Sequence, residues 1–283
     1  HQAAPNSRQY SMLKNIPLSA ALGLAITTIY FLAAIFADWI APYGMAEAVG
    51  DVWEPSSSEH WLGTDQIGRD LLTRMIYGGQ TTILIATMAT ILSFVTGSVL
   101  GFIAAVSGGW VDQVMSRLVD LFMSIPSLIL ALVILSSIEA TVVTLVVIMG
   151  LLDSTRVYRL ARAVAVDITV MDYVEAARLR GEKLQWIIFR EILPNALSPL
   201  VAEMGLRFIF MVLFISTLSF LGIGVQPPLA DWGGIVKENK EGINFGIGAA
   251  LYPAVAIATL AISVNLIADW VLNRTTSLKG GRG

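Results

Sequence analysis

The polar residues of this chain offer little material for catalysis. The sequence has no cysteine and two histidines, His1 and His60, which excludes thiolate chemistry, disulfides and a histidine-rich metal cluster. It has no Gly-Lys dipeptide, so a Walker A loop is absent. No Ser-His-Asp, Cys-His or paired-carboxylate arrangement can be assembled from the remaining polar residues. We expect a chain that is not an enzyme, holds no metal or cofactor, and leaves nucleotide to another polypeptide.

One polar stretch, residues 167–199, has a pattern that suits a mechanical contact better than catalysis. It contains Glu-Ala-Ala-Arg-Leu-Arg-Gly at 175–181 and an apolar stripe at 184–188. Gly181 interrupts the helical pattern, and Pro194 is expected to end regular helix. The spacing predicts two short helices that are joined at the glycine.

These two predicted helices could dock on a soluble partner. Arg178 and Glu182 stand at i and i+4, where opposite charges pair on one helix face. A short helix held between two membrane spans can press into a groove, and a glycine joint lets the two backbones approach closely. The alternative is an ordinary cytoplasmic loop whose arginines only set topology.

The hydrophobic residues gather in long blocks, which indicates a bilayer environment. They make up 55% of 283 residues, and only 14% are charged, whereas a soluble domain has about 25% charged residues. The net charge of −3 gives no basic surface for nucleic acid. The sequence predicts one all-α integral membrane domain over 1–283. Its transmembrane helices, about six, each of about 20 apolar residues, are expected near 18–38, 82–106, 118–138, 141–160, 200–222 and 250–272.

The basic residues fall mostly on one side of these predicted spans. Arg69, Arg74, Lys237 and Lys240 lie outside, and Arg207 lies within the fifth span. If the N-terminus is cytoplasmic, the other 13 of the 18 basic residues lie on the inner side: Arg8, Lys14, Arg117, Arg156, Arg159, Arg162, Arg178, Arg180, Lys183, Arg190, Arg274, Lys279 and Arg282. The positive-inside rule then predicts six spans with both termini cytoplasmic. The cytoplasmic segments are 1–17, 161–199 and 273–283, and the outer ones are 39–80 and 223–249.

The first outer segment, 39–80, is long for a connection and is expected to have structure of its own. After Thr64 and Asp65, apolar residues recur on one face. The opposite, polar face holds Arg69, Asp70, Thr73 and Arg74. This pattern predicts an amphipathic helix at the outer interface that ends at Gly78 and Gly79. The helix either gates the substrate or only leads into the next span.

The second outer segment, 223–249, is rich in glycine and proline. This density is expected to exclude a regular element and to give a shaped or re-entrant loop. Trp232 is expected at the membrane interface.

Two patterns lie within the predicted spans. Glu203 and Arg207 are four residues apart in the fifth span and are expected to neutralise each other, as a structural pair or as a gate. Gly97 and Gly101 make a small-xxx-small pair in the second span, which favours close packing against another span.

The cytoplasmic stretch resembles the loop motif of binding-protein-dependent ABC importer permeases: Glu-Ala-Ala, three residues, Gly, nine residues, Ile-x-Leu-Pro. Glu175, Ala176, Ala177, Gly181, Leu193 and Pro194 match this motif, and Glu191 departs from it. The stretches 62–70 and 220–233 resemble the second permease of dipeptide, oligopeptide and nickel importers. The tail after Leu272 is unlike that class.

The resemblance implies a type I ABC importer permease fold and a multi-pass location in the bacterial inner membrane. It also implies four kinds of partner: a second related permease chain, two ATPase subunits that hold ATP and Mg, an extracytoplasmic solute-binding protein, and lipid. Residues 175–190, including Arg178, would dock on the ATPase. The expected cargo is di- or oligopeptides, with nickel, opines or sugar derivatives as alternatives. Substrate-binding residues stay unknown, and a secondary transporter is the remaining alternative class.

Overall fold

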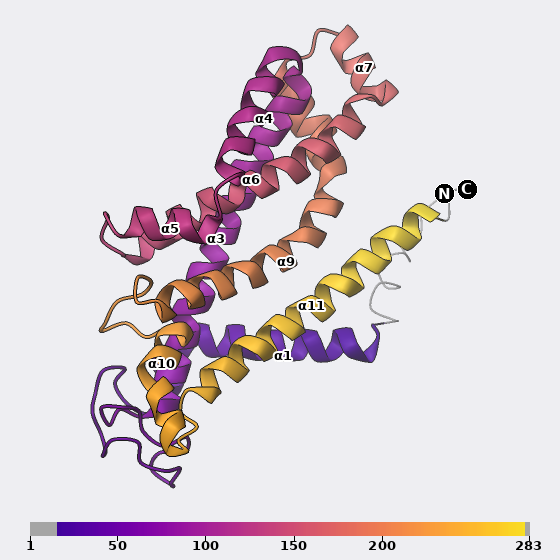
Figure 1. Ribbon diagram of the computed structural model, residues 1–283. Coiled ribbons are helices and arrows are strands. Elements are labelled where there is room, and N and C mark those ends of the chain that lie inside the picture. Colours follow the sequence, from indigo (N-terminus) through magenta and orange to yellow (C-terminus); the bar gives the residue numbers. More distant parts are fainter. Residues whose placement is uncertain (1–15, 281–283) are drawn as a thin grey trace.

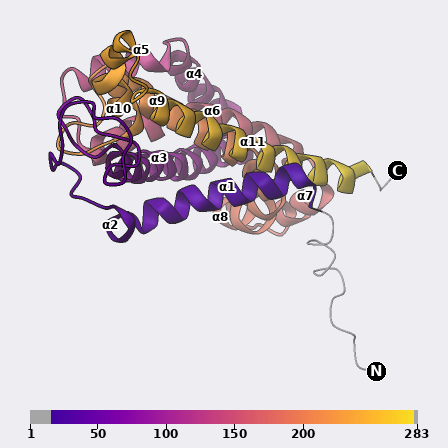
Figure 2. The same cartoon turned by 90° about the horizontal axis from the view of Figure 1, so that it is seen from below.

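The protein is built from helices, as the computed structural model shows for the backbone of residues 16–280 and the side chains of residues 16–273. No strand occurs among these residues, where only isolated bridges join Ala48 to Arg69 and Thr64 to Asp70. The predicted tail residues 1–15 and 281–283 lie outside the described part. The long helix α3 runs the length of the molecule, and α1 and α11 lie side by side (Figures 1 and 2).

The helices vary widely in length. They are α1 Leu18–Ile35, α2 Ala37–Ile40, α3 Leu71–Ser107, α4 Gly109–Met123, α5 Ser127–Leu135, α6 Val142–Thr169, α7 Asp172–Leu179, α8 Leu184–Trp186, α9 Leu193–Phe220, α10 Trp232–Asn239 and α11 Leu251–Gly280. A π-helical segment, Ile187–Ile192, joins α8 to α9, and a 3-10 segment, Lys240–Phe245, follows α10.

Within the described chain, four helical segments are long and apolar enough to cross a membrane. They are Leu18–Ile35, Leu71–Ser107, Leu184–Phe220 and Leu251–Asn273, and a fifth is the pair α4 and α5, if it forms one span bent by 79°. The predicted spans at 18–38, 82–106, 200–222 and 250–272 fall on the first four. The predicted span at 118–138 is broken at 124–126, where Pro126 cannot donate a backbone hydrogen bond.

Helices α3 and α6 pack closely, as the glycine pair of the second span predicts. A Cβ at Gly97 would lie 2.7 Å from the Ser154 carbonyl oxygen, and one at Gly101 would lie 2.8 Å from that of Tyr158. Only residues without a side chain allow the two backbones to approach this closely. The predicted close packing of this glycine pair against another helix is confirmed.

Gly78 and Gly79 do not end a helix, contrary to the prediction. They lie inside α3, which begins at Leu71 after the N-cap Asp70. A Cβ at Gly79 would lie 2.9 Å from the Trp232 ring, so these glycines make room for an aromatic side chain. Trp232 is 2% exposed and its Nε1 donates to the Met75 carbonyl at 3.0 Å. Its predicted place at the membrane interface is therefore wrong.

The polar residues around the start of α3 are buried, and two of them, Arg69 and Arg74, form ion pairs with α10. Arg69 and Arg74 both donate to Glu238 Oε2, at 2.9 and 2.8 Å. Arg69 also donates to Asp65 Oδ2 at 2.6 Å. These pairs offset the cost of burying charge, and they tie the outer segment to α10. The predicted amphipathic helix with a polar face at the outer interface is wrong, because Arg69 and Asp70 precede α3 and the polar residues are buried.

The second outer segment contains regular elements despite its glycines. Asp231 caps α10 by accepting hydrogen bonds from the backbone N–H groups of Gly233 and Gly234. Burial raises the pKa of its carboxyl group to about 6, although these hydrogen bonds favour the charged form. The expectation that no regular element forms here is wrong. The Asp231 cap starts α10, and the missing side chain of Gly233 lets α10 pack against the Ser216 backbone.

Candidate functional site: a cytoplasmic loop and an intramembrane charge junction

The motif-bearing loop is one short exposed helix followed by a glycine turn. Helix α7 ends in a Schellman motif, in which Glu182 N–H donates to the Ala177 carbonyl at 3.2 Å and Gly181 N–H donates to that of Arg178 at 2.9 Å. Gly181 has a φ of +76°, which a residue with a Cβ adopts only with strain. The predicted glycine joint is confirmed.

The second predicted short helix is not separate. Residues from Leu184 onward continue through the π-helical segment into α9. Pro194 lies directly after the π-helical segment, where the helix continues into α9, and it does not end a helix, contrary to the prediction. The turn at Gly181 is thus followed directly by a membrane-length helix.

One face of α7 is anchored and the other is open. Val174 and Ala177 are fully buried in a cluster that includes Phe102 of α3 and Ile192. Glu175 and Ala176 are exposed, and Leu179 is 82% exposed. The open face of α7 therefore presents Leu179 beside charged residues.

Arg178 does not pair with Glu182, contrary to the prediction. Its Nη2 donates to the Val106 carbonyl at the end of α3, at 3.3 Å. Glu182 instead lies 3.8 Å from Arg180 Nε. The glycine turn after Leu179 ends the helix before Glu182, so the i, i+4 geometry is lost. Arg178 thereby links the loop to a second long helix.

The predicted pair of Glu203 and Arg207 forms and has a further partner. Arg207 Nε donates to Glu203 Oε1 at 3.1 Å, and its Nη1 donates to Asp153 Oδ1 of α6 at 3.2 Å. Ser93 of α3 donates to the other Asp153 oxygen at 3.0 Å. This charge junction, which consists of Ser93, Asp153, Glu203 and Arg207, joins three helices.

Sequence reasoning missed Asp153. Its side chain is 1% exposed, so an unpaired charge there would be costly. The signal available was a single acidic residue within the apolar block at 141–160, since ionisable residues inside spans are rare and have partners.

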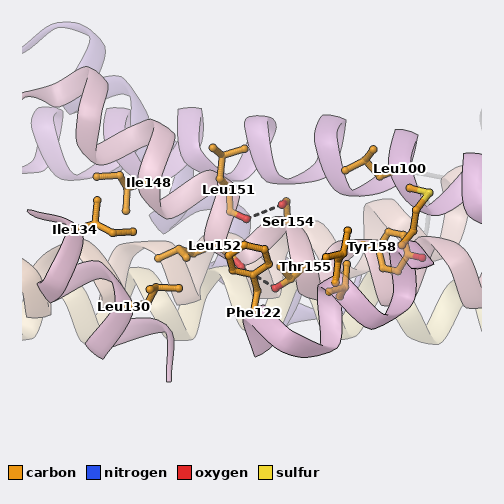
Figure 3. Close-up of a pocket in the computed structure, with 13 residues that line it drawn as sticks. Leu100, Phe122, Leu130, Ile134, Ile148, Leu151, Leu152, Ser154, Thr155 and Tyr158 are labelled. Carbon is orange, nitrogen blue, oxygen red and sulfur yellow. Dashed lines mark hydrogen bonds between the residues drawn. The ribbon is translucent and has the colours of Figure 1, made fainter. Parts of the chain in front are cut away.

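An apolar hollow of about 600 Å³ lies between α4, α5 and α6 (Figure 3). Its lining hydroxyls are already used, because Ser154 Oγ and Thr155 Oγ1 donate to carbonyls of their own helix at 2.6 and 2.8 Å, and the Tyr158 hydroxyl is hydrogen-bonded to Ser116 Oγ at 2.9 Å. A solute site normally has a few polar groups free to fix orientation. This hollow fits an apolar filling better than a polar cargo.

Comparisons with known proteins identify a family of membrane transport proteins. A family described as binding-protein-dependent transport system inner membrane component matches residues 97–277. The dipeptide transport system permease protein DppC of Escherichia coli (strain K12) is 38% identical over 257 residues, which cover 88% of this chain and 86% of the relative. The putative peptide transport system permease protein of Brucella suis biovar 1 is 36% identical over 252 residues, covering 89% and 85%.

A third relative extends the match along the chain. The dipeptide transport system permease protein DppC of Alkalihalophilus pseudofirmus is 31% identical over 267 residues, covering 94% of this chain and 88% of the relative. The matched family region includes the loop around α7 and three residues of the charge junction, Asp153, Glu203 and Arg207. The chain belongs to the family of binding-protein-dependent transport system inner membrane components, and it is a multi-pass permease of an ABC importer in the bacterial inner membrane.

Proposed function

We propose that this permease forms half of the translocation pathway for di- or oligopeptides and is driven by ATPase subunits that dock on residues 175–194. The observation that carries the proposal is the exposed face of α7, a short helix that lies in the chain between the long helices α6 and α9. Its partners are a second related permease, two ATPase subunits with ATP and Mg, and an extracytoplasmic solute-binding protein. The peptide names of the relatives support peptides over nickel, opines or sugar derivatives.

The membrane arrangement that we propose has six spans, with both termini cytoplasmic. The added span is α6, which has 28 residues and is therefore about 42 Å long. Hydropathy alone disfavours it because of its charges, but three of these are paired: Asp153 with Arg207, Arg159 with Asp120, and Arg162 with Asp112. Paired charges make such a helix tolerable in a bilayer.

We assign Arg207 a structural role in this arrangement. It holds α9 to α6, because it donates to Asp153, and Ser93 extends the contact to α3. A helix that moves with the cytoplasmic loop then carries α6 with it. In this role Arg207 is a positioning residue and not a gate.

Uptake by the reconstituted complex tests the proposal. Proteoliposomes that contain both permeases and the ATPase subunits, with the binding protein outside, should accumulate a labelled dipeptide only when ATP and Mg²⁺ reach the ATPase. Accumulation driven by an ion gradient without ATP would instead indicate a secondary transporter. ATP-dependent uptake of a nickel salt or a sugar derivative, with no peptide uptake, would overturn the cargo assignment.

A further inference from the structure

Arg156 is an exposed cation next to the charge junction, and it forms no ion pair among the described residues, although its charge acts on Asp153 at longer range. Its guanidinium carbon lies 4.9 Å from the centre of the Phe210 ring, and that of Arg207 lies 5.8 Å from the same ring. Arg207 has two carboxylate partners. Arg156 makes no ion pair or hydrogen bond within the part of the chain that the structure describes. One of the two cations on this ring is therefore available to an anion.

The position of Arg156 makes lipid an unsuitable neighbour. Phe210, over which its guanidinium lies, stands 10 residues before the end of α9 at Phe220, or about 15 Å along the helix axis. An exposed charge at such depth normally faces a water-filled cavity or the bundle interior. The side chains of Glu203 and Arg207, next to Arg156, are 30% and 21% exposed.

A second feature of this face is the break between two membrane helices. The break between α4 and α5 leaves Ser124, Ile125 and Pro126 exposed. Arg156 and Pro126 line one small cleft of about 70 Å³ beside this break. Broken backbone at membrane depth is tolerated where it lines a protein or water-filled cavity, and broken helices are common at transporter binding sites.

The free groups on this face match a zwitterion. Arg156 offers an unpaired guanidinium, and Glu203 Oε2 accepts no hydrogen bond from the described residues, because Arg207 uses only Oε1. A guanidinium binds a carboxylate with two parallel hydrogen bonds. A peptide carries one carboxylate and one ammonium group at its ends.

We propose that Arg156 binds the terminal carboxylate of a peptide as it passes through the permease. This inference rests on the proposed function, since it assumes a peptide cargo. The residue contacts substrate in transit and is separate from the loop that couples to the ATPase. Arg159, one turn along α6, is already paired with Asp120 at 2.6 Å and is the matched control.

The absence of cysteine from this chain allows a direct test in the reconstituted complex. Arg156→Cys should lower dipeptide uptake at least tenfold, while stimulation of ATP hydrolysis by the binding protein stays within twofold. A cationic aminoethyl methanethiosulfonate should react from water and restore at least a third of the uptake. The anionic sulfonatoethyl reagent should react without restoring it, and excess dipeptide should slow both reactions.

Several controls make the result decisive. Arg159→Cys should keep at least half of the uptake, and Ile29→Cys, at an exposed apolar position of α1, should not react. The unmodified complex treated with each reagent reports on cysteines of the other subunits. If the unmodified complex takes up no peptide, the proposed function fails. Labelling of Arg156→Cys from the aqueous phase then still reports whether this position is exposed to water.

Three results would overturn the inference on Arg156. The first is an introduced thiol that does not react from water. The second is equal rescue by the cationic and anionic reagents. The third is loss of the assembled complex in Arg156→Gln, which would indicate an ion pair with the second permease chain.

Discussion

Gly181 is the residue on which transmission through the cytoplasmic loop depends. Its φ of +76° costs a β-branched residue about 1–2 kcal/mol, and no neighbouring atom lies within 4 Å of an added Cβ. Gly181→Val should therefore distort the turn through its backbone alone. We predict that it lowers peptide-coupled ATP hydrolysis at least fivefold, while Gly181→Asn, which tolerates this conformation, keeps most of it.

Gly246 provides the control for this prediction. It has a φ of +74° and equally open surroundings, but it lies in the outer segment. Gly246→Val should carry a similar backbone cost and leave coupling intact. Equal loss of coupling in the two valine variants would mean that strain, and not the position of the turn, is responsible.

Arg207 tests whether the charge junction is structural. Arg207→Gln leaves Asp153 buried without its cation, which should cost about 3 kcal/mol of stability and lower the thermal unfolding temperature in detergent. Adding Asp153→Asn should recover part of that loss, because the two residues are directly coupled. An unchanged unfolding temperature together with abolished uptake would favour a gate instead.

At this scale, one of the two predicted short-range pairs forms, the pair of Arg178 and Glu182 does not, and the long-range contacts were not predictable. The spacing of Glu203 and Arg207 fixes their contact within one helix. The contacts of Arg178 with Val106 and of Arg207 with Asp153 join residues 72 and 54 positions apart, and no periodicity encodes them. Trp232 was misplaced for the same reason, since its pocket is formed by glycines of α3.

The packing of α3 against α6 is the contact on which the helical arrangement relies. Gly97→Ala would place a Cβ 2.7 Å from both the Ser154 oxygen and the Val157 Cβ, so it should destabilise the protein by about 1–3 kcal/mol. Gly205→Ala is the control, because its nearest contact would be an ordinary 3.5 Å. Thermal unfolding in detergent measures both, and equal unfolding temperatures would contradict the close packing.

Hydropathy located most elements but not their ends. The apolar blocks match α1, α9 and α11 because a bilayer imposes their length. Local glycine and proline signals failed at Gly78, Gly79 and Pro194, which all lie inside helices. In each case tertiary packing or a first-turn position permits the residue, and neither is visible in sequence spacing.

The distribution of charge over the whole molecule leads to a specific prediction of sidedness. Trp61 in the outer segment is 69% exposed and Leu179 at the end of α7 is 82% exposed, with three proposed spans between them. In sealed right-side-out vesicles, an impermeant thiol reagent should label Trp61→Cys and not Leu179→Cys. Inverted vesicles should give the opposite pattern. Labelling of both positions from one side would contradict the crossing of α6.

The identity of the chain's partners tests the central claim most directly. Affinity purification of the tagged chain from its native membrane, with quantitative mass spectrometry, should recover one second permease chain and two ATPase subunits per copy. We expect this because Glu175, Ala176 and Leu179 of α7 are exposed and available to a partner chain. Recovery of a homo-oligomer without any ATPase would contradict the account.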